Sequence, residues 1–135
     1  MGKEMDKLVT LTRKEVLDLL AEGKNLEECD ARKANLMKID FSGCNMKNCN
    51  LSYANLKDAI FRDADLTGAS LWNANLEGAD FTNANLEDAD LDYAKLRGAN
   101  LYRANIRRAS LPTELIPRED IMASVEQGCK VGQKR

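Results

Sequence analysis

Residues 54–88 read ANLKD AIFRD ADLTG ASLWN ANLEG ADFTN ANLED, which are seven consecutive blocks of five residues. The pattern continues in both directions, so that sixteen blocks run from residue 34 to residue 113 without an insertion. The central residue of every block is large and apolar, from Leu36 in the first block to Leu111 in the last. Such regularity is the sequence signature of a repeat architecture, and it decides the fold class.

Each position of the block has its own residue preference. Two places before the centre stands Ala in thirteen of the sixteen blocks, with Ile39, Cys44 and Cys49 as exceptions. One place before the centre stands Asn, Asp or Ser in fourteen blocks, with Ile60 and Lys95 as exceptions. The two places after the centre are mainly polar, charged or Gly. Weaker copies of the block occupy residues 24–28 and 29–33.

A period of five fits neither a continuous helix nor a continuous strand. In an α-helix successive centres would drift by about 140° around the axis, and in a strand they would alternate between faces. All centres can be buried only if every block turns a corner, with the central residue and the residue two before it facing inward. The Asn, Asp or Ser between them then lies beside the corner, where its side chain can bond nearby backbone.

The phenylalanines indicate the number of sides. Phe41, Phe61 and Phe81 are all block centres and are separated by 20 residues. If one coil comprises four blocks, the rings stack in one column, which Leu101 continues. These four residues form the predicted structural core of an all-β solenoid with four sides and about four to four and a half coils.

The blocks at residues 54–58, 64–68, 74–78 and 84–88 resemble the A-(N/D)-L-x-x unit of the pentapeptide-repeat family. The resemblance implies a right-handed quadrilateral β-helix. It also implies that the C-terminal end is a dimer interface in some relatives, and that some members protect DNA gyrase from quinolones by mimicking duplex DNA. Such a repeat specifies an architecture and does not by itself specify a function.

Short α-helices are predicted at both ends of the array. Thr12 and Glu15 form a capping-box pattern before a helix that presents Val16, Leu17, Leu20 and Ala21 on one side, and Gly23 ends it. Pro117 begins a second helix that presents Ile121, Met122 and Val125 and stops at Gly128. The predicted organisation is an N-terminal segment with a capping helix (1–23), the solenoid (24–113), and a C-terminal capping helix with a basic tail (114–135).

Composition excludes several classes of function. The 135 residues include no histidine, which excludes Ser-His-Asp catalysis and histidine-ligated metal centres, and no other catalytic, cofactor or metal motif is present. We therefore expect a protein that is not an enzyme and that has no cofactor. The formal net charge of -2 argues against nucleic-acid binding. No signal peptide or membrane span is evident, so the expected location is the cytoplasm.

Three of the four cysteines occupy the small inward site of a block. Cys29 and Cys49 are 20 residues apart and should lie one coil apart on the same wall, within disulfide range. Adjacent reduced thiols are the expected state, and a disulfide requires an oxidising compartment. Cys129, in the basic tail, is the cysteine expected to be exposed.

An acidic band raises the possibility of DNA mimicry. Between Arg62 and Lys95 there is no basic residue, but there are eight acids. The 20-residue coil places Glu77 between Lys57 and Arg97, Glu87 under Arg107, and Asp88 under Arg108, which would neutralise the band. Asp65, Asp80 and Asp90 are corner residues with a structural role. Asp63 and Asp92 are left as the clearest unpaired acids.

Exposed aromatic residues give the strongest candidate for a partner surface. Trp72 stands one place after its block centre, and Tyr53 and Tyr93 stand two places after theirs, one coil before and one coil after. Together with Asp92 and Asp63 they form the candidate partner surface, because Trp and Tyr are enriched at interface centres. The sequence favours a non-catalytic structural or protein-interaction module, as a monomer or as a homodimer through its C-terminal end. The alternative is a DNA-mimicking regulator of DNA gyrase or topoisomerase.

Overall fold

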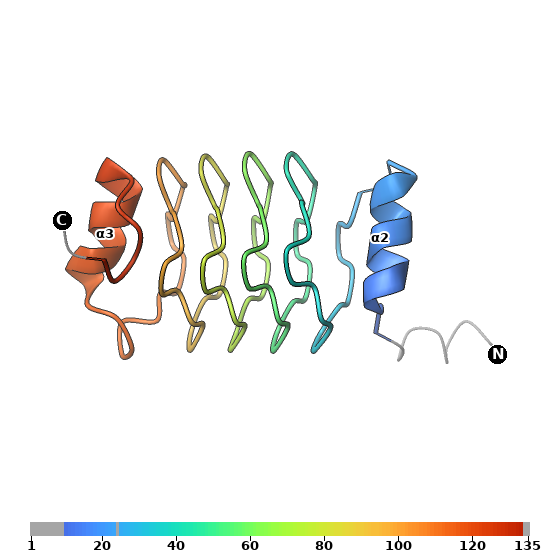
Figure 1. Ribbon diagram of the computed structural model, residues 1–135, viewed down its shortest axis with the longest axis horizontal. Coiled ribbons are helices and arrows are strands. Elements are labelled where there is room, and N and C mark those ends of the chain that lie inside the picture. Colours follow the sequence, from blue (N-terminus) through green and yellow to red (C-terminus); the bar gives the residue numbers. More distant parts are fainter. Residues whose placement is uncertain (1–9, 24, 134–135) are drawn as a thin grey trace.

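A computed structural model describes residues 10–23 and 25–133. It is a row of stacked coils with one helix beside each end (Figure 1). Helix α2 (Arg13–Ala21) lies beside the first coil, and helix α3 (Arg118–Gln127) lies beside the last. The two helices therefore lie at opposite ends of the row of coils.

The coils are joined by parallel β-bridges between residues 20 positions apart. These bridges run from the pair Asp30 and Asn50 to the pair Asp90 and Ser110. Each bridge is isolated, and no continuous strand is assigned in the described part of the chain. The prediction of a coil of 20 residues is confirmed, whereas regular strands do not form, because the chain turns after every block and leaves one bridging residue per side.

Most corners are closed by an Asn or Asp before the block centre and by a left-handed residue after it. The Oδ1 atom of Asn75, for example, accepts a hydrogen bond from the backbone N–H of Glu77 at 3.1 Å. The next residue, Gly78, has a φ of 71°, in the region that Gly, Asn and Asp tolerate best. The block composition follows from this geometry: an acceptor side chain before the centre, and Gly, Asn or Asp frequently two places after it.

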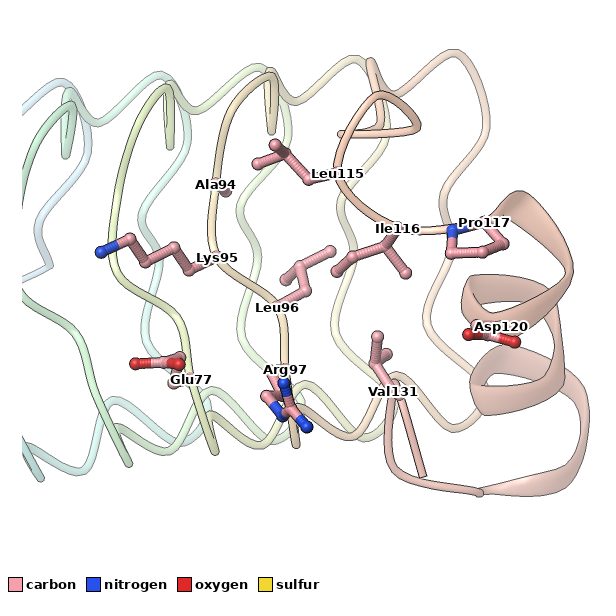
Figure 2. A pocket seen from close by; sticks show the side chains of 11 residues that line it. Glu77, Ala94, Lys95, Leu96, Arg97, Leu115, Ile116, Pro117, Asp120 and Val131 are labelled. Carbon is pink, nitrogen blue, oxygen red and sulfur yellow. The ribbon is translucent and has the colours of Figure 1, made fainter. Parts of the chain in front are cut away.

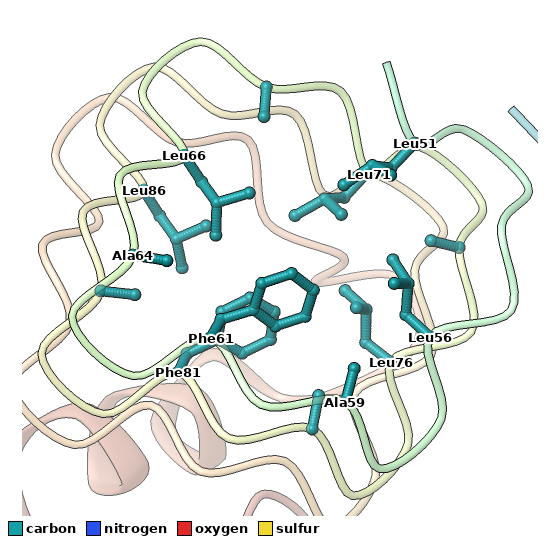
Figure 3. Close-up of a cluster of buried hydrophobic side chains, with 14 of the residues drawn as sticks. Leu51, Leu56, Ala59, Phe61, Ala64, Leu66, Leu71, Leu76, Phe81 and Leu86 are labelled. Carbon is teal, nitrogen blue, oxygen red and sulfur yellow. The ribbon is translucent and has the colours of Figure 1, made fainter. Parts of the chain in front are cut away.

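The centres and the small residues two places before them fill the interior of the coils (Figure 3). From Leu36 to Leu101 every block centre is at most 1% exposed. The Phe41 and Phe61 rings stack with centroids 5.2 Å apart, and those of Phe61 and Phe81 are 4.8 Å apart. Alanine beside these columns leaves room for the large centres, so the interior needs few aromatic side chains.

Both predicted helices are present, although the inward face of the first differs from the prediction. Thr12 and Glu15 form the full capping box of α2, and Val16 is buried. Leu17 is 42% exposed, and Ala21 is exposed as well. The side chains that pack against the core beside Val16 are Leu19 and Leu20. The helix is thus rotated relative to the predicted face.

At the other end, α3 follows Pro117, and Gly128 ends it with a φ of 77°. Ile121 is fully buried, and the half-buried Val125 packs against the core. The tail then returns to the last coil, where the Gly98 N–H donates to Val131 O at 2.8 Å and the Val131 N–H donates to Ala99 O at 2.9 Å. The tail thereby supplies backbone partners for part of the last coil, which the sequence pattern does not reveal.

Candidate interaction surface

The aromatic side chains singled out from the sequence lie together on one wall. Trp72 stands between Tyr53 and Tyr93, with ring centroids 5.1 Å and 5.9 Å away and interplanar angles of 77° and 79°. We call these three residues the aromatic patch. Edge-to-face pairs of this kind contribute about 0.5–1.5 kcal/mol each beyond the area that they bury. The patch therefore holds a defined shape across three successive coils.

The two tyrosines present about half of their surface to solvent. Tyr53 is 50% exposed and Tyr93 is 48% exposed, whereas Trp72 is half-buried. Both tyrosines have a φ of 61°, which is unfavourable for a bulky residue. From Lys38 to Arg108, the corner geometry imposes this conformation on every residue two places after a centre, including Asn73, which lies between the two tyrosines. The patch is a rigid apolar surface held by backbone geometry.

The two acids of the predicted surface do not lie together. Asp92 follows Trp72 by 20 residues in the same column, and its Oδ1 accepts a hydrogen bond from the Ser110 hydroxyl at 2.5 Å. It therefore has a hydrogen-bond partner, although it forms no ion pair with a cation of the described residues, as the prediction states. Asp63 is exposed, but it lies two blocks, or half a coil, from the wall of Trp72. The candidate surface thus consists of the aromatic patch and Asp92, without Asp63.

The acidic band is partly neutralised between coils. Asp65 pairs with Lys47 at 3.8 Å, and Asp80 pairs with Arg62 at 3.3 Å. Arg108 pairs with Asp88 at 2.9 Å and also with Glu87. The hydrogen bond from the Arg108 guanidinium lowers the pKa of the Asp88 carboxyl.

Two of the predicted pairings are wrong. Glu87 pairs with Arg108, not with Arg107, and Glu77 forms no ion pair with any cation in residues 10–23 and 25–133. The side chains of Arg and Lys reach several neighbours, so stacking in register does not choose the partner.

The corner acids have the structural role predicted for them. Asp65 accepts hydrogen bonds from both the backbone N–H and the hydroxyl of Thr67, at 3.0 and 2.6 Å. Burial alone would raise the pKa of this carboxyl, but the Thr67 hydrogen bonds and the charge of Lys47 together lower it. Asp80 and Thr82 repeat the same arrangement.

All four cysteines are free. Cys49 is buried, and burial raises the pKa of its thiol strongly, with Cys29 and Cys44 nearby adding to the shift. Cys129 is half-buried, so the prediction of an exposed thiol is wrong. No group of three or more metal-binding side chains occurs in the described residues, and no helix among them is long and apolar enough to cross a bilayer.

A groove that the sequence did not predict lies beside the last coil, with a volume of about 310 Å³. Figure 2 shows it between the turn that carries Leu115 and Ile116 and the tail residue Val131. Lys95 and Arg97 contribute its cations. The available sequence signal was the exception at Lys95, where a corner Asn or Asp is missing.

A family model described as pentapeptide repeats matches the chain in eight copies, over residues 25–63, 44–83, 59–92 and 84–112. Comparison with curated protein sequences finds no match. Among solved structures, the pentapeptide repeat protein Rfr23 from the cyanobacterium Cyanothece 51142 is similar, with 36% identity and a TM-score of 0.60. The similarity covers 60% of this chain and 55% of that one.

Two further structures are similar. A pentapeptide repeat protein of the Arabidopsis thaliana thylakoid lumen has 24% identity and a TM-score of 0.58, covering 71% of this chain and 81% of that one. HetL from Nostoc sp. strain PCC 7120, involved in heterocyst differentiation regulation, has 31% identity and a TM-score of 0.53. Here the similarity covers 76% of this chain and 45% of that one, so the chain spans about half the length of both cyanobacterial proteins.

Proposed function

Because the chain belongs to the pentapeptide repeat family, we propose that it is a non-catalytic module that binds another protein through the aromatic patch. The observation that carries this proposal is the contact geometry of Tyr53, Trp72 and Tyr93. The Trp72 ring makes edge contacts with both tyrosine rings, which are half exposed, so the patch offers apolar area with little side-chain freedom left to lose on binding.

The module in this proposal is a right-handed β-helix of about four coils that α2 and α3 cap. Apolar side chains support the capping role at both ends: Val16 of α2 and Ile121 of α3 are both buried in the same core as the coils. Capping matters for the function because an open end of a solenoid exposes unpaired backbone, which associates nonspecifically.

The charges on the solenoid give less support to DNA mimicry. A mimic requires a continuous negative face, but Lys47, Arg62 and Arg108 form ion pairs with acids of the band. Exposed pairs contribute about 0–1 kcal/mol to stability, yet they remove the uncompensated charge that mimicry needs. We therefore favour recognition of a protein by apolar contact.

The test compares partners captured from cells of the source organism by the parent chain and by a triple variant. The variant carries Tyr53→Asn, Trp72→Ser and Tyr93→Asn, residues that the repeat already accepts at these places, as Asn73 and Ser52 show. We expect mass spectrometry to show partners with the parent that the variant loses at least tenfold. Each partner is then purified and its binding measured directly.

The matched control is Tyr102→Ser, which removes one aromatic from the same block place as Trp72 on a different wall. We expect this control to retain the partners and all variants to keep the circular dichroism of the parent. Capture of the same partners by the triple variant would contradict the proposal. So would inhibition of gyrase supercoiling by the parent and the triple variant alike.

A further inference from the structure

The wall that contains Leu96 ends in an unoccupied β-bridge position. Lys95 bridges to the preceding coil: its N–H donates to Ala74 O at 3.0 Å, and its carbonyl accepts from the Leu76 N–H at 2.9 Å. Ala94 O and the Leu96 N–H follow Ala74 O and the Leu76 N–H by 20 residues, and they are the groups that would bond a bridging residue of a following coil. Neither has a hydrogen-bond partner among residues 10–23 and 25–133.

The position is vacant because the chain turns away from it. The residue that follows Lys95 by one coil is Leu115, but its N–H donates to Pro112 O at 3.0 Å within a tight turn. Its side chain is 55% exposed. Farther along the same edge the next pair of backbone groups is already occupied, since Val131 pairs there. A slot for a single extended residue therefore remains between the turn and the tail.

The slot opens into the groove of about 310 Å³ beside the last coil. Ala94 and Leu96 line it and are both fully buried, so their unpaired carbonyl and N–H also lack water, which is unfavourable. Leu115 and Ile116 supply apolar walls (Figure 2). An added segment would displace the exposed side chain of Leu115, and an apolar residue of the segment would then pack against that leucine.

The charges beside the slot indicate what should flank that apolar residue. Lys95 and Arg97 line the groove, and neither forms an ion pair with any acid in the described part of the chain. Two acids also line the groove: Asp120 lies at its opposite end, and Glu77 lies on the side of Lys95 and Arg97 (Figure 2), but neither acid forms an ion pair with these two cations. Acidic residues next to the bridging residue would complement these cations.

We propose that this slot binds an extended segment of another protein, in which an apolar residue is followed by acidic residues. One residue of the segment would bridge the edge, donating its N–H to Ala94 O and accepting from the Leu96 N–H. This is strand addition to an unpaired edge position, in which backbone bonds provide affinity and neighbouring pockets provide specificity. Because Ala94 and Leu96 are fully buried, the side chain of Leu115 has to move aside before the segment can bond to them. The slot is separate from the aromatic patch, so this interface does not depend on the proposed function.

The first test is hydrogen exchange of the ¹⁵N-labelled chain, measured by NMR. We expect the Leu96 amide to exchange at least tenfold faster than the Leu76 amide, which is bonded to Lys95 O. Equal protection of the two amides in the free protein would overturn the proposal, because the slot would then be occupied already.

The second test uses a synthetic peptide with the sequence of residues 82–88, TNANLED, acetylated and amidated at its ends. In the folded chain its residue Asn85 makes the same kind of bridge to the coil below, and its leucine is followed by two acids. We expect the peptide to slow exchange of the Leu96 amide and to shift resonances around the groove. A peptide with proline in place of Asn85, which lacks the N–H, should bind roughly tenfold more weakly.

Two variants at the slot and one control variant complete the design. Leu115→Asp places a negative charge in the slot and should weaken binding of the peptide at least tenfold, whereas Leu17→Asp alters another exposed leucine, at the opposite end, and should not. Lys95→Glu is a second variant at the slot with the same expected loss. Equal binding of the proline peptide, or resonance shifts confined to the aromatic patch, would overturn the proposal.

Discussion

At the residue scale, the side chain before most block centres closes the corner. In fourteen of sixteen blocks it is Asn, Asp or Ser, and Asn and Asp accept the backbone N–H two residues later, as Asn75 does. Lys95 occupies this place one coil after Asn75 and cannot accept a hydrogen bond. The Arg97 N–H consequently has no acceptor among the described residues.

Lys95→Asn should therefore stabilise the protein, although it replaces an exposed residue. The new Oδ1 atom would accept the Arg97 N–H, and the expected gain in the free energy of unfolding is about 0.5–1.5 kcal/mol. Denaturant unfolding monitored by circular dichroism measures it. Lys57→Asn is the control, because it makes the same substitution one place after a centre, and we expect a change within about 0.5 kcal/mol. No gain for Lys95→Asn would contradict the role of the corner acceptor.

At the scale of the elements, each wall is a column of identical environments. Phe61 has a stacked ring on either side, at 5.2 and 4.8 Å, and it is fully buried. The column ends in Leu101, which occupies the same place without an aromatic ring. We therefore expect the stability of the column to depend on side-chain volume more than on ring stacking.

Phe61→Ala should lower the free energy of unfolding by about 3–5 kcal/mol, since it leaves a cavity between two rings that the backbone bridges hold in place. Phe61→Leu should cost less than half as much, because a leucine already fits the column at residue 101. Thermal and denaturant unfolding of both variants test this. Equal losses for Ala and Leu would show that ring stacking, not filling of volume, stabilises the column.

At the scale of the whole molecule, the near-zero net charge results from opposite charges distributed over successive coils. Asp65 illustrates how the fold holds these charges. Its pKa is lowered from 3.8, because the Thr67 hydrogen bonds and the Lys47 charge outweigh the opposite effect of burial. A carboxyl whose folded pKa is depressed stabilises the protein above its unfolded pKa, and that contribution is lost as the pH falls through the folded pKa.

The free energy of unfolding should therefore decrease as the pH falls below about 4. Asp65→Asn keeps the Oδ1 acceptor, as Asn45 and Asn85 do in the same column, but it removes the titrating group. We expect a shallower acid dependence in this variant than in the parent, measured by denaturant unfolding between pH 2 and 6. Thr67→Ser retains the hydroxyl donor and should keep the slope of the parent. An unchanged slope in Asp65→Asn would contradict the assignment.

The sequence by itself determined the coil of 20 residues, the inward-facing columns and the corner hydrogen bonds. These follow from local chain geometry that repeats in every block, so a pattern of five letters is enough to specify them. It also placed Tyr53, Trp72 and Tyr93 on one wall, because positions in a periodic coil can be counted.

Only the tertiary structure decided the features that the repeat does not fix. Arg108 pairs with both Glu87 and Asp88, and Glu77 has no cation, because long side chains choose among several neighbours at similar energy. The ends depend on contacts that occur once. Val131 pairs with one part of the last coil and Leu115 turns away from another, and this leaves the Leu96 N–H without a partner in the described chain. A periodic pattern carries no information about where it stops being periodic.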